Sequence, residues 1–432
     1  MGQGQYDYII VGAGIAGLHC ALRISKAFPK AKIAITEMYD YTGGRIFTYR
    51  NPSIKVSWEA GAGRIHSSHK HTLQYIKEYG LTLLPISTNS QWIPEDTAIP
   101  DKDVWPSISD IIVTALEKLE PKILATNTVE EILESNYLTQ RFPYKAELSS
   151  MRADLAIESL KTTMSSNDGF YVVKQGLSAL TTKMRNELLK RRVEFFYNHR
   201  LISVDGQGSQ GQGSQNGLHF TVSPARSDSS IYPSKKSHHS HVTFQAKKTI
   251  LAIHSDALKS ISSFHNLPAL KHILMKPLLR TYGVFPSKAW FSGIPKTVTD
   301  SPLRHIIPVN PKAGILMTSY TDAEDTTQWA KILNTKGEMA LETAIMGKTR
   351  ELFPAIDIPN PMFFKAHHWK HGCSYWLPGL YDPKAESEKI MCPLPLTFPT
   401  IFVCGESYSL KQAWIEGAIE HAEQMLQKYI FR

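Results

Sequence analysis

The sequence predicts an α/β fold built on a Rossmann-like parallel sheet, and three observations lead to this prediction. Residues 6–11 are a short aromatic and β-branched run, which suits a buried parallel strand. The segment Gly12-Ala13-Gly14-Ile15-Ala16-Gly17 follows at once and leads into residues 18–28, whose apolar positions recur at helical spacing. Residues 32–36 read as a second strand and are followed by Glu37. A strand, glycine-rich turn, helix, strand and acid in this order are typical of a dinucleotide-binding unit.

Each part of the glycine-rich segment has a physical task in such a unit. Gly12 permits the tight turn, Gly14 lets backbone approach a pyrophosphate, and Gly17 lets the helix pack closely on the strand. The helix N-terminus at Ile15 and Ala16 presents N–H groups and a partial positive charge to the phosphates. The acid after the second strand would accept hydrogen bonds from ribose hydroxyls. The alternative is a glycine-rich turn without a ligand, and the order of the elements favours the dinucleotide.

A second glycine pair, Gly43-Gly44-Arg45, narrows the choice of dinucleotide. Such a pair with an arginine, placed after the ribose acid, is typical of proteins that bind FAD in an extended conformation. The arginine then meets the phosphates, and nicotinamide dehydrogenases lack it. The sequence therefore predicts FAD.

Composition bounds the remaining possibilities. The 432-residue chain carries 48 Lys and Arg against 39 Asp and Glu, and 42% of its residues are hydrophobic. These values exclude disorder and fibrous structure, and the four scattered cysteines exclude a disulfide framework and favour a reducing compartment. With no signal peptide, membrane span or C-terminal anchor seen, we expect a soluble, cytoplasmic protein. The net charge of +9 favours anionic partners, nucleic acid among them, although no motif supports nucleic acid.

Five patches spread along the chain resemble the flavin amine oxidases, the family of monoamine, polyamine and L-amino-acid oxidases. The first two are the segments already described. The third is Trp58-Glu59-Ala60-Gly61-Ala62-Gly63-Arg64-Ile65, and the fourth runs from residues 176–180 to residues 249–253. The fifth joins Phe402-Val403-Cys404-Gly405-Glu406 to residues 414–420.

The resemblance implies two interleaved domains, because the first and last patches must share one cofactor. An FAD-binding Rossmann-like domain of the two-dinucleotide-binding type would comprise residues 1–84, 176–262 and 390–432. An α+β substrate domain would comprise residues 85–175 and 263–389. A tract at 206–217, rich in Gly, Gln and Ser, is expected to form a hairpin tip.

The resemblance also implies the cofactor contacts. Glu406 would meet the ribityl or phosphate end, the Leu201 amide would touch the adenine, and the final helix would point its N-terminus at the flavin N1–C2=O edge. The full set of expected FAD contacts is Gly12, Gly14, Ile15, Ala16, Gly17, Glu37, Gly44, Arg45, Gly61, Ala62, Gly63, Arg64, Leu201, Gly405, Glu406, Trp414, Ile415 and Ala418. No metal is predicted, and His238, His239 and His241 are interpreted as a solvated loop.

Family members oxidise the C–N bond of an amine or L-amino acid by hydride transfer to flavin N5, and dioxygen reoxidises the flavin. Arg64 falls where amino-acid oxidases place the arginine that faces the substrate carboxylate; the alternative is that it only braces the flavin or a neighbouring acid. Aromatic walls for the amine are expected from five residues. Trp414, Tyr375 and Trp376 are assigned as catalytic, and Trp369 and Tyr408 as substrate-binding. Core packing is the alternative for Tyr375 and Trp376.

Two departures from the family pattern bear on activity. Arg280 stands where most members carry a lysine that assists the reaction with oxygen; we assign it as catalytic, although an arginine does not readily lose its proton. Cys373 lies near the position of the flavin-linking cysteine of monoamine oxidases, but the spacing differs and we expect non-covalent FAD. An FAD-binding protein with weak or no oxidase turnover, serving a structural or interaction role, is therefore kept as the alternative. A desaturase or porphyrinogen-type oxidase is disfavoured by residues 414–418.

Overall fold

The structure, a computed structural model, describes residues 5–87, 89–95, 105–134, 142, 145–161, 169–205, 216–222, 240–286 and 289–432. The tip predicted within 206–217 lies outside them except for its last two residues, and so do His238 and His239. Among the described residues, no helix combines the length and apolar composition needed to cross a membrane.

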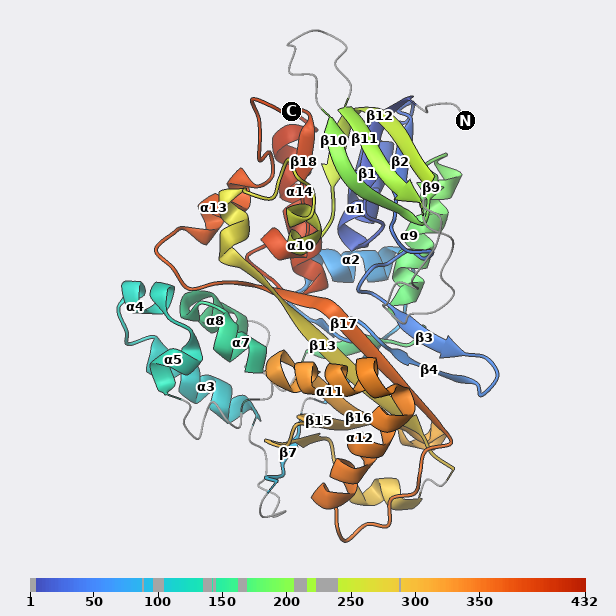
Figure 1. Cartoon of the computed structure of the whole chain (residues 1–432), viewed down its shortest axis with the longest axis vertical. Coiled ribbons are helices and arrows are strands. Elements are labelled where there is room, and N and C mark those ends of the chain that lie inside the picture. Colours follow the sequence, from blue (N-terminus) through green and yellow to red (C-terminus); the bar gives the residue numbers. More distant parts are fainter. Residues whose placement is uncertain are drawn as a thin grey trace.

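A seven-stranded sheet occupies the upper part of Figure 1 and confirms the predicted α/β fold. Its order is β10-β11-β12-β1-β2-β9, and β18 also pairs with β12. The strands are β1 (Gln5–Val11), β2 (Ile33–Thr36), β9 (Glu194–Phe196), β10 (His199–Asp205), β11 (Asn216–Val222), β12 (Ser240–Leu251) and β18 (Ile401–Val403). Five of them, β9, β2, β1, β12 and β18, run parallel to one another.

Strand β12 joins distant parts of the chain. Its first half pairs antiparallel with β11, and its second half pairs in parallel with β1. The last residues, Thr249–Leu251, also pair in parallel with β18 on the other side. The glycine-rich segment after β1 and the closing motif after β18 therefore emerge from the same edge of the sheet.

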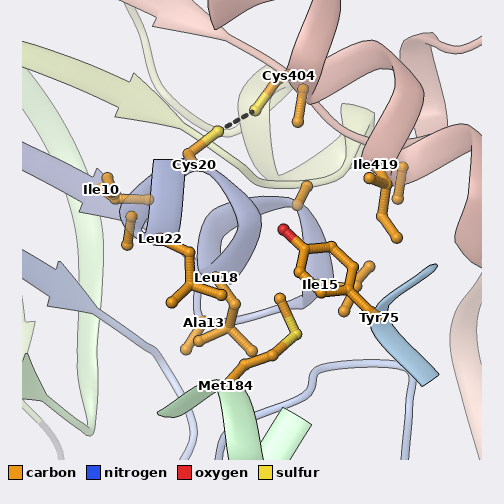
Figure 2. Packing of buried hydrophobic residues seen from close by; sticks show 14 of the residues in the cluster. Ile10, Ala13, Ile15, Leu18, Cys20, Leu22, Tyr75, Met184, Cys404 and Ile419 are labelled. Atoms are coloured by element: carbon orange, nitrogen blue, oxygen red, sulfur yellow. Dashed lines mark hydrogen bonds between the residues drawn. The ribbon is translucent and has the colours of Figure 1, made fainter. Parts of the chain in front are cut away.

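Helices α1 (Ile15–Ala27), α9 (Ser178–Lys190) and α14 (Ile415–Tyr429) share one hydrophobic cluster against this sheet. Figure 2 shows Leu18 and Leu22 of α1 packed near Met184 of α9 and Ile419 of α14. The four side chains are fully buried, and burial of each stabilises the fold by roughly 1.5–3 kcal/mol. In the same cluster the thiols of Cys20 and Cys404 lie 3.7 Å apart, so α1 touches the chain directly after β18.

The lower part of Figure 1 holds a six-stranded sheet of order β17-β13-β16-β15-β14-β7. Helices α11 (Ala323–Lys336) and α12 (Glu338–Leu352) pack on it. Two of its strands are long and run up toward the first sheet, β13 (Ile273–Val284) and β17 (Phe363–Trp376). The others are β7 (Gln91–Trp92), β14 (Thr297–Val298), β15 (His305–Asn310) and β16 (Ile315–Asp322).

Shorter elements complete the fold. A lobe of helices contains α3 (Trp105–Leu116), α4 (Pro121–Thr126), α5 (Val129–Leu133), α7 (Lys145–Ser150) and α8 (Ala153–Ser159). Small sheets pair β3 (Thr48–Asn51) with β4 (Val56–Glu59), and β8 (Phe170–Val173) with β5 (Ile65–His66) and β6 (Leu83–Pro85). The remaining helices are α2 (Lys70–Glu78), α10 (Ser255–Lys259), α13 (Pro383–Lys389) and the 3-10 turns η2 (Pro268–His272), η3 (Ala289–Gly293), η4 (Pro311–Ala313) and η5 (Glu406–Tyr408).

The division of the chain into two interleaved domains stays a proposal. The strands of the first sheet come from residues 5–36, 194–251 and 401–403, and the strands of the second from residues 91–92 and 273–376. These origins support the proposed partition. Strand β8, however, pairs with β5 and β6, so residues 170–173 adjoin the end of the first FAD-domain segment.

Glu416, in the first turn of α14, fastens α2 to the C-terminal helix. Its carboxylate accepts hydrogen bonds of 2.9 Å from the backbone N–H groups of His71 and Thr72, and a third from the Thr72 hydroxyl. The side chain is fully buried. A negative charge therefore meets the N–H groups and the positive dipole end of α2.

We expect the Glu416→Gln variant to lower the free energy of unfolding by roughly 1–3 kcal/mol, because an amide leaves a buried N–H or hydroxyl without its acceptor. Glu420→Gln, one turn further along the same helix, is the matched control and should change stability by less than about 0.5 kcal/mol. Urea unfolding followed by circular dichroism measures both. Equal losses in the two variants would contradict the capping role.

Candidate active site

The three glycines of the first motif occupy three different environments. Gly12 has φ +106°, and a Cβ there would lie 2.5 Å from the carbonyl oxygen of Ala252. A Cβ on Gly17 would lie 2.0 Å from the Gly12 carbonyl oxygen, so the helix can approach the turn only with glycine. Gly14, which precedes α1, faces open space within 4 Å of its Cβ position. The described residues give α1 no side-chain cap and no acid in its first turn.

Glu37 is hydrogen-bonded to this turn. Its carboxylate accepts hydrogen bonds from the backbone N–H of Ala13 (2.8 Å) and of Tyr39 (3.0 Å). Burial raises the pKa of the carboxyl, and these two bonds oppose the rise. The Glu37 backbone carbonyl also accepts a hydrogen bond from the N–H of His199. This bond brings the start of β10, which contains the buried Leu201, to the same end of the sheet.

The second glycine pair and the closing motif meet beside the first turn. Gly43 donates its N–H to the Ala13 carbonyl, and a Cβ on Gly44 would lie 3.5 Å from the Gly14 Cα. Arg45 forms a 2.7 Å ion pair with Glu406, whose own exposure is 6%. The Arg45 guanidinium also donates to the carbonyl of Gly372 on β17.

Glu406 is further fixed by backbone and hydroxyl donors. It accepts from the Ala413 N–H (2.7 Å) and from the N–H and hydroxyl of Ser374 (3.3 and 2.9 Å). Gly405, which precedes it, has φ +139°, a conformation that favours glycine. The residues predicted from separate motifs therefore lie side by side in this part of the structure.

The segment from Glu59 to Arg64 runs beside Arg45 and is held through its carbonyl groups. The Arg280 guanidinium donates to the carbonyls of Glu59 and Gly61, and the Trp369 indole donates to the carbonyl of Ala60 (2.7 Å). Tyr282 adds a bond from its hydroxyl to the Glu59 carbonyl. These donors come from the long strands β13 and β17, and in this way the second sheet fixes the position of a loop that adjoins the first.

Arg64 lies against two neighbouring aromatic rings. Its guanidinium carbon is 4.7 Å from the centre of the Phe170 ring and 5.5 Å from that of Trp414. His69 also packs against Trp414, edge to face with ring centres 4.9 Å apart, and burial lowers the pKa of its imidazole to about 3. Arg64 is therefore flanked by apolar surface and by a neutral imidazole.

The family model described as flavin-containing amine oxidoreductase matches residues 15–104 and 125–425. The chain belongs to the flavin-containing amine oxidoreductase family. It is therefore an oxidoreductase of the flavoprotein amine oxidase type, and the family's cofactor is a flavin.

Relatives of low identity support the assignment. The chain is 23% identical to an L-amino-acid oxidase of Mus musculus, over 95% of this chain and 69% of that one. A putative L-amino-acid oxidase of Bacillus subtilis is also 23% identical, over 95% and 92%. An uncharacterised protein of Acanthamoeba polyphaga mimivirus is 20% identical over 98% and 94%. A structure of a putrescine oxidase variant superposes with TM-score 0.74 at 14% identity over 99% of both chains, which shows a common fold.

The residues of this amine oxidoreductase fit FAD. The open space at Gly14, the uncapped N-terminus of α1 and the cation of Arg45 suit a pyrophosphate. Glu37 lies at the end of β2, where a ribose acid belongs in this fold. Ile415 and Ala418 open α14 directly after Trp414, so the helix N-terminus faces the region next to Arg64.

The predicted aromatic walls fall into two groups. Trp414 lies beside Arg64, and Tyr375 is buried in the helical lobe's core cluster, which Trp414 also contacts. Trp376 and Tyr408 pack in the core cluster under the first sheet, where the Trp376 indole donates to Ser409 and the Tyr408 hydroxyl to Ile253. Core packing, the alternative for Trp376, matches these contacts. A wall role for Trp376 and Tyr408 stays a prediction.

Sequence reasoning missed a pair of buried acids, of which Glu147 interacts electrostatically with Arg64. Glu147 on α7 and Asp322 at the end of β16 are 8% and 5% exposed. Burial and the charge of Asp322 raise the pKa of Glu147 to about 8, and a hydrogen bond from its own backbone N–H, a hydrogen bond with Tyr375 and the charge of Arg64 oppose the rise. Burial raises the pKa of Asp322 to about 6, against the attraction of Arg304. Neither acid belongs to a motif, and only tertiary packing brings them here.

Because the pKa of Glu147 is raised in the folded protein, this residue lowers the stability of the fold as pH rises. The carboxyl keeps its proton in the folded protein up to about pH 8 but loses it near 4.5 when unfolded, so stability present below pH 4.5 is lost as pH rises toward 8. We expect Glu147→Gln to raise the free energy of unfolding by roughly 1–3 kcal/mol near pH 9 and by almost nothing near pH 4.5. Denaturant unfolding across this range measures the difference. The exposed Glu324→Gln is the control, and a pH-independent effect of the Glu147 substitution would contradict the shift.

Proposed function

We propose that the protein is an FAD-dependent oxidase of the flavin amine oxidase type that oxidises the C–N bond of an amine or L-amino acid, with dioxygen as acceptor. Hydride passes from the substrate carbon to flavin N5 in this proposal. The observation that carries it is Arg64, whose guanidinium lies against the rings of both Phe170 and Trp414, next in sequence to residues 61–63 and beside the residue that precedes α14. A guanidinium in this position suits a substrate carboxylate.

The residues around Arg64 could orient a substrate. When bound, FAD would supply the acceptor for the hydride, so the protein itself has to bind the substrate, orient it and exclude water. The rings of Phe170 and Trp414 provide an apolar surface, and neutral His69 adds no competing charge. Arg280, Tyr282 and Trp369 hold the neighbouring backbone from behind.

Non-covalent FAD is part of the proposal. The Cys373 thiol is buried, donates to the Tyr375 hydroxyl (3.1 Å) and has a pKa raised by burial. A thiol in this state is a poor nucleophile. Acid precipitation of the purified protein tests this point, since the flavin absorbance should remain in the supernatant.

The family and its oxidase relatives favour an enzyme over the alternative of a flavin protein with a structural role. The direct test is anaerobic mixing of the purified yellow protein with a panel of amines and L-amino acids. Loss of flavin absorbance with at least one substrate, and peroxide after admission of air, are expected. No bleaching with any member of the panel would reject the proposal.

Arg64→Met should separate amino acids from amines. We expect kcat/KM for L-norleucine to fall by roughly 10²–10³-fold, because the carboxylate loses a charged partner, while pentylamine changes by less than about threefold. Steady-state peroxide production measures both substrates. Arg50→Met, which removes an arginine from the β3 strand, is the control. Parallel losses for amine and amino acid would instead assign Arg64 to bracing the flavin.

Arg280→Lys tests the role of dioxygen. The guanidinium is engaged by two carbonyls and lies 4.4 Å from the centre of the Tyr320 ring, so little of it is left to hold a water. A lysine is more compact at its tip and can give up a proton, and we expect it to speed reoxidation of photoreduced flavin by roughly tenfold or more. Stopped-flow mixing with oxygenated buffer measures this step without substrate. A wild-type rate that is already high, and unchanged in the variant, would contradict the expectation.

A further inference from the structure

Glu147 is a buried acid whose hydrogen bonding the fold leaves incomplete. Its helix, α7, packs against β17, and 8% of the side chain is exposed. Within the described part of the chain, the buried oxygen Oε2 has no hydrogen-bond partner. A buried carboxyl oxygen in this state carries a desolvation cost, and a catalytic role or a bound water, ion or ligand accounts for such a group in native proteins.

The groups around Glu147 connect it to the surroundings of Arg64. Tyr375, on β17, hydrogen-bonds the carboxyl, and its hydroxyl in turn accepts from Cys373. The positive charge of Arg64 acts on Glu147, and the charge of Glu147 acts on Tyr320. The Tyr320 ring lies over Arg280, whose guanidinium is next to Gly61 and Gly63. Glu147 therefore shares its surroundings with the segment proposed to line the flavin.

Arg64 and Glu147 thus act on each other in one part of the structure. Arg64 offers a cation, and Glu147 offers a carboxyl with an unfilled acceptor. A substrate with an anionic group for Arg64 and a cationic group for Glu147 would contact both side chains and supply the partner that Glu147 Oε2 lacks. An L-amino acid with an uncharged side chain would leave Glu147 unpaired.

We propose that Glu147 is a specificity-determining residue that binds the cationic end of an L-amino acid whose side chain carries an ammonium or guanidinium group. This inference rests on the proposed function and names its substrate class. The α-carboxylate would pair with Arg64, and the distal cation would donate to Glu147 Oε2. No sequence motif marks Glu147, because the acid reaches the site through the packing of α7 on β17.

The proposal predicts that the KM for a basic amino acid depends on the protonation of Glu147 and therefore on pH. Its pKa of about 8 reflects burial first and then the charge of Asp322, opposed by Tyr375 and Arg64. A bound cation stabilises the carboxylate, so binding at pH 7 releases a proton from Glu147. The KM for a basic amino acid should therefore fall as pH rises from 7 to 8.5, relative to the KM for an uncharged one. The other titratable groups that act on this carboxyl, Asp322, Cys373 and Tyr375, come from β16 and β17.

L-Lysine and L-norleucine form the matched substrate pair, because they differ by the terminal ammonium. We expect the wild-type protein to prefer L-lysine in kcat/KM by roughly tenfold or more, and Glu147→Gln to lower kcat/KM for L-lysine by roughly 10²-fold. The same variant should leave L-norleucine within about threefold. Glu324→Gln, an exposed acid beyond the end of β16, is the control and should change neither substrate.

The outcomes separate this inference from the proposed function. Bleaching by L-norleucine but not by L-lysine, or equal losses for both substrates in Glu147→Gln, would overturn the role of Glu147 and leave the oxidase intact. The absence of bleaching by any amine or amino acid would reject the oxidase itself. 1,5-Diaminopentane, which lacks the carboxylate, should be a poorer substrate than L-lysine; a preference for it would overturn the amino-acid part. The wild-type panel decides these points even where a variant fails to hold flavin.

Discussion

The parallel pairing of β12 with β1 on one side and β18 on the other is the constraint on which the site depends. These ladders bring Val11, Leu251 and Val403 to one edge, although they lie far apart in the sequence. The first glycine turn and the closing motif, both proposed to touch the cofactor, leave the sheet at this edge. The glycine turn after β1, the segment after β12 and the closing motif after β18 can then meet, as the ion pair of Arg45 with Glu406 illustrates. Hydrophobic packing of α1 on α14 holds the arrangement from one face.

A second constraint is the support of the loop from Glu59 to Arg64 by the other sheet. Its carbonyl groups are satisfied by side chains of β13 and β17, so the loop has a fixed path without being part of either sheet. Arg280 is central to this support. Under the proposed correspondence of Arg280 with the family lysine, an arginine would change two properties together: its guanidinium bonds two backbone carbonyls, and it does not have the proton chemistry of an amine. Arg280 is therefore better suited to hold the loop from Glu59 to Arg64 than to hold a water.

The sequence predicted those parts of the structure that local chemistry dictates. Glycines with positive φ or close backbone contacts, such as Gly12 and Gly17, have a recognisable pattern, and so do buried parallel strands and the acid after β2. The residues that surround Arg64 are brought together by tertiary contacts instead. Phe170 reaches it through the pairing of β8 with β5, and Glu147 through the packing of α7. Such contacts have no local signature, which is why sequence reasoning named Arg64 and Trp414 but missed Phe170, His69 and Glu147.

The buried glutamates of the described residues show how differently the fold treats similar groups. Glu37, Glu406 and Glu416 each receive backbone N–H groups on their carboxylates, so their burial is compensated by the structure itself. Glu147 is buried to a similar extent and retains an oxygen without a donor. If Glu147 served only the stability of the fold, an uncharged side chain of the same shape would serve better, because the carboxyl must keep its proton to remain buried. The three compensated acids hold elements together, whereas the fourth is explained by a cation that arrives from outside the chain.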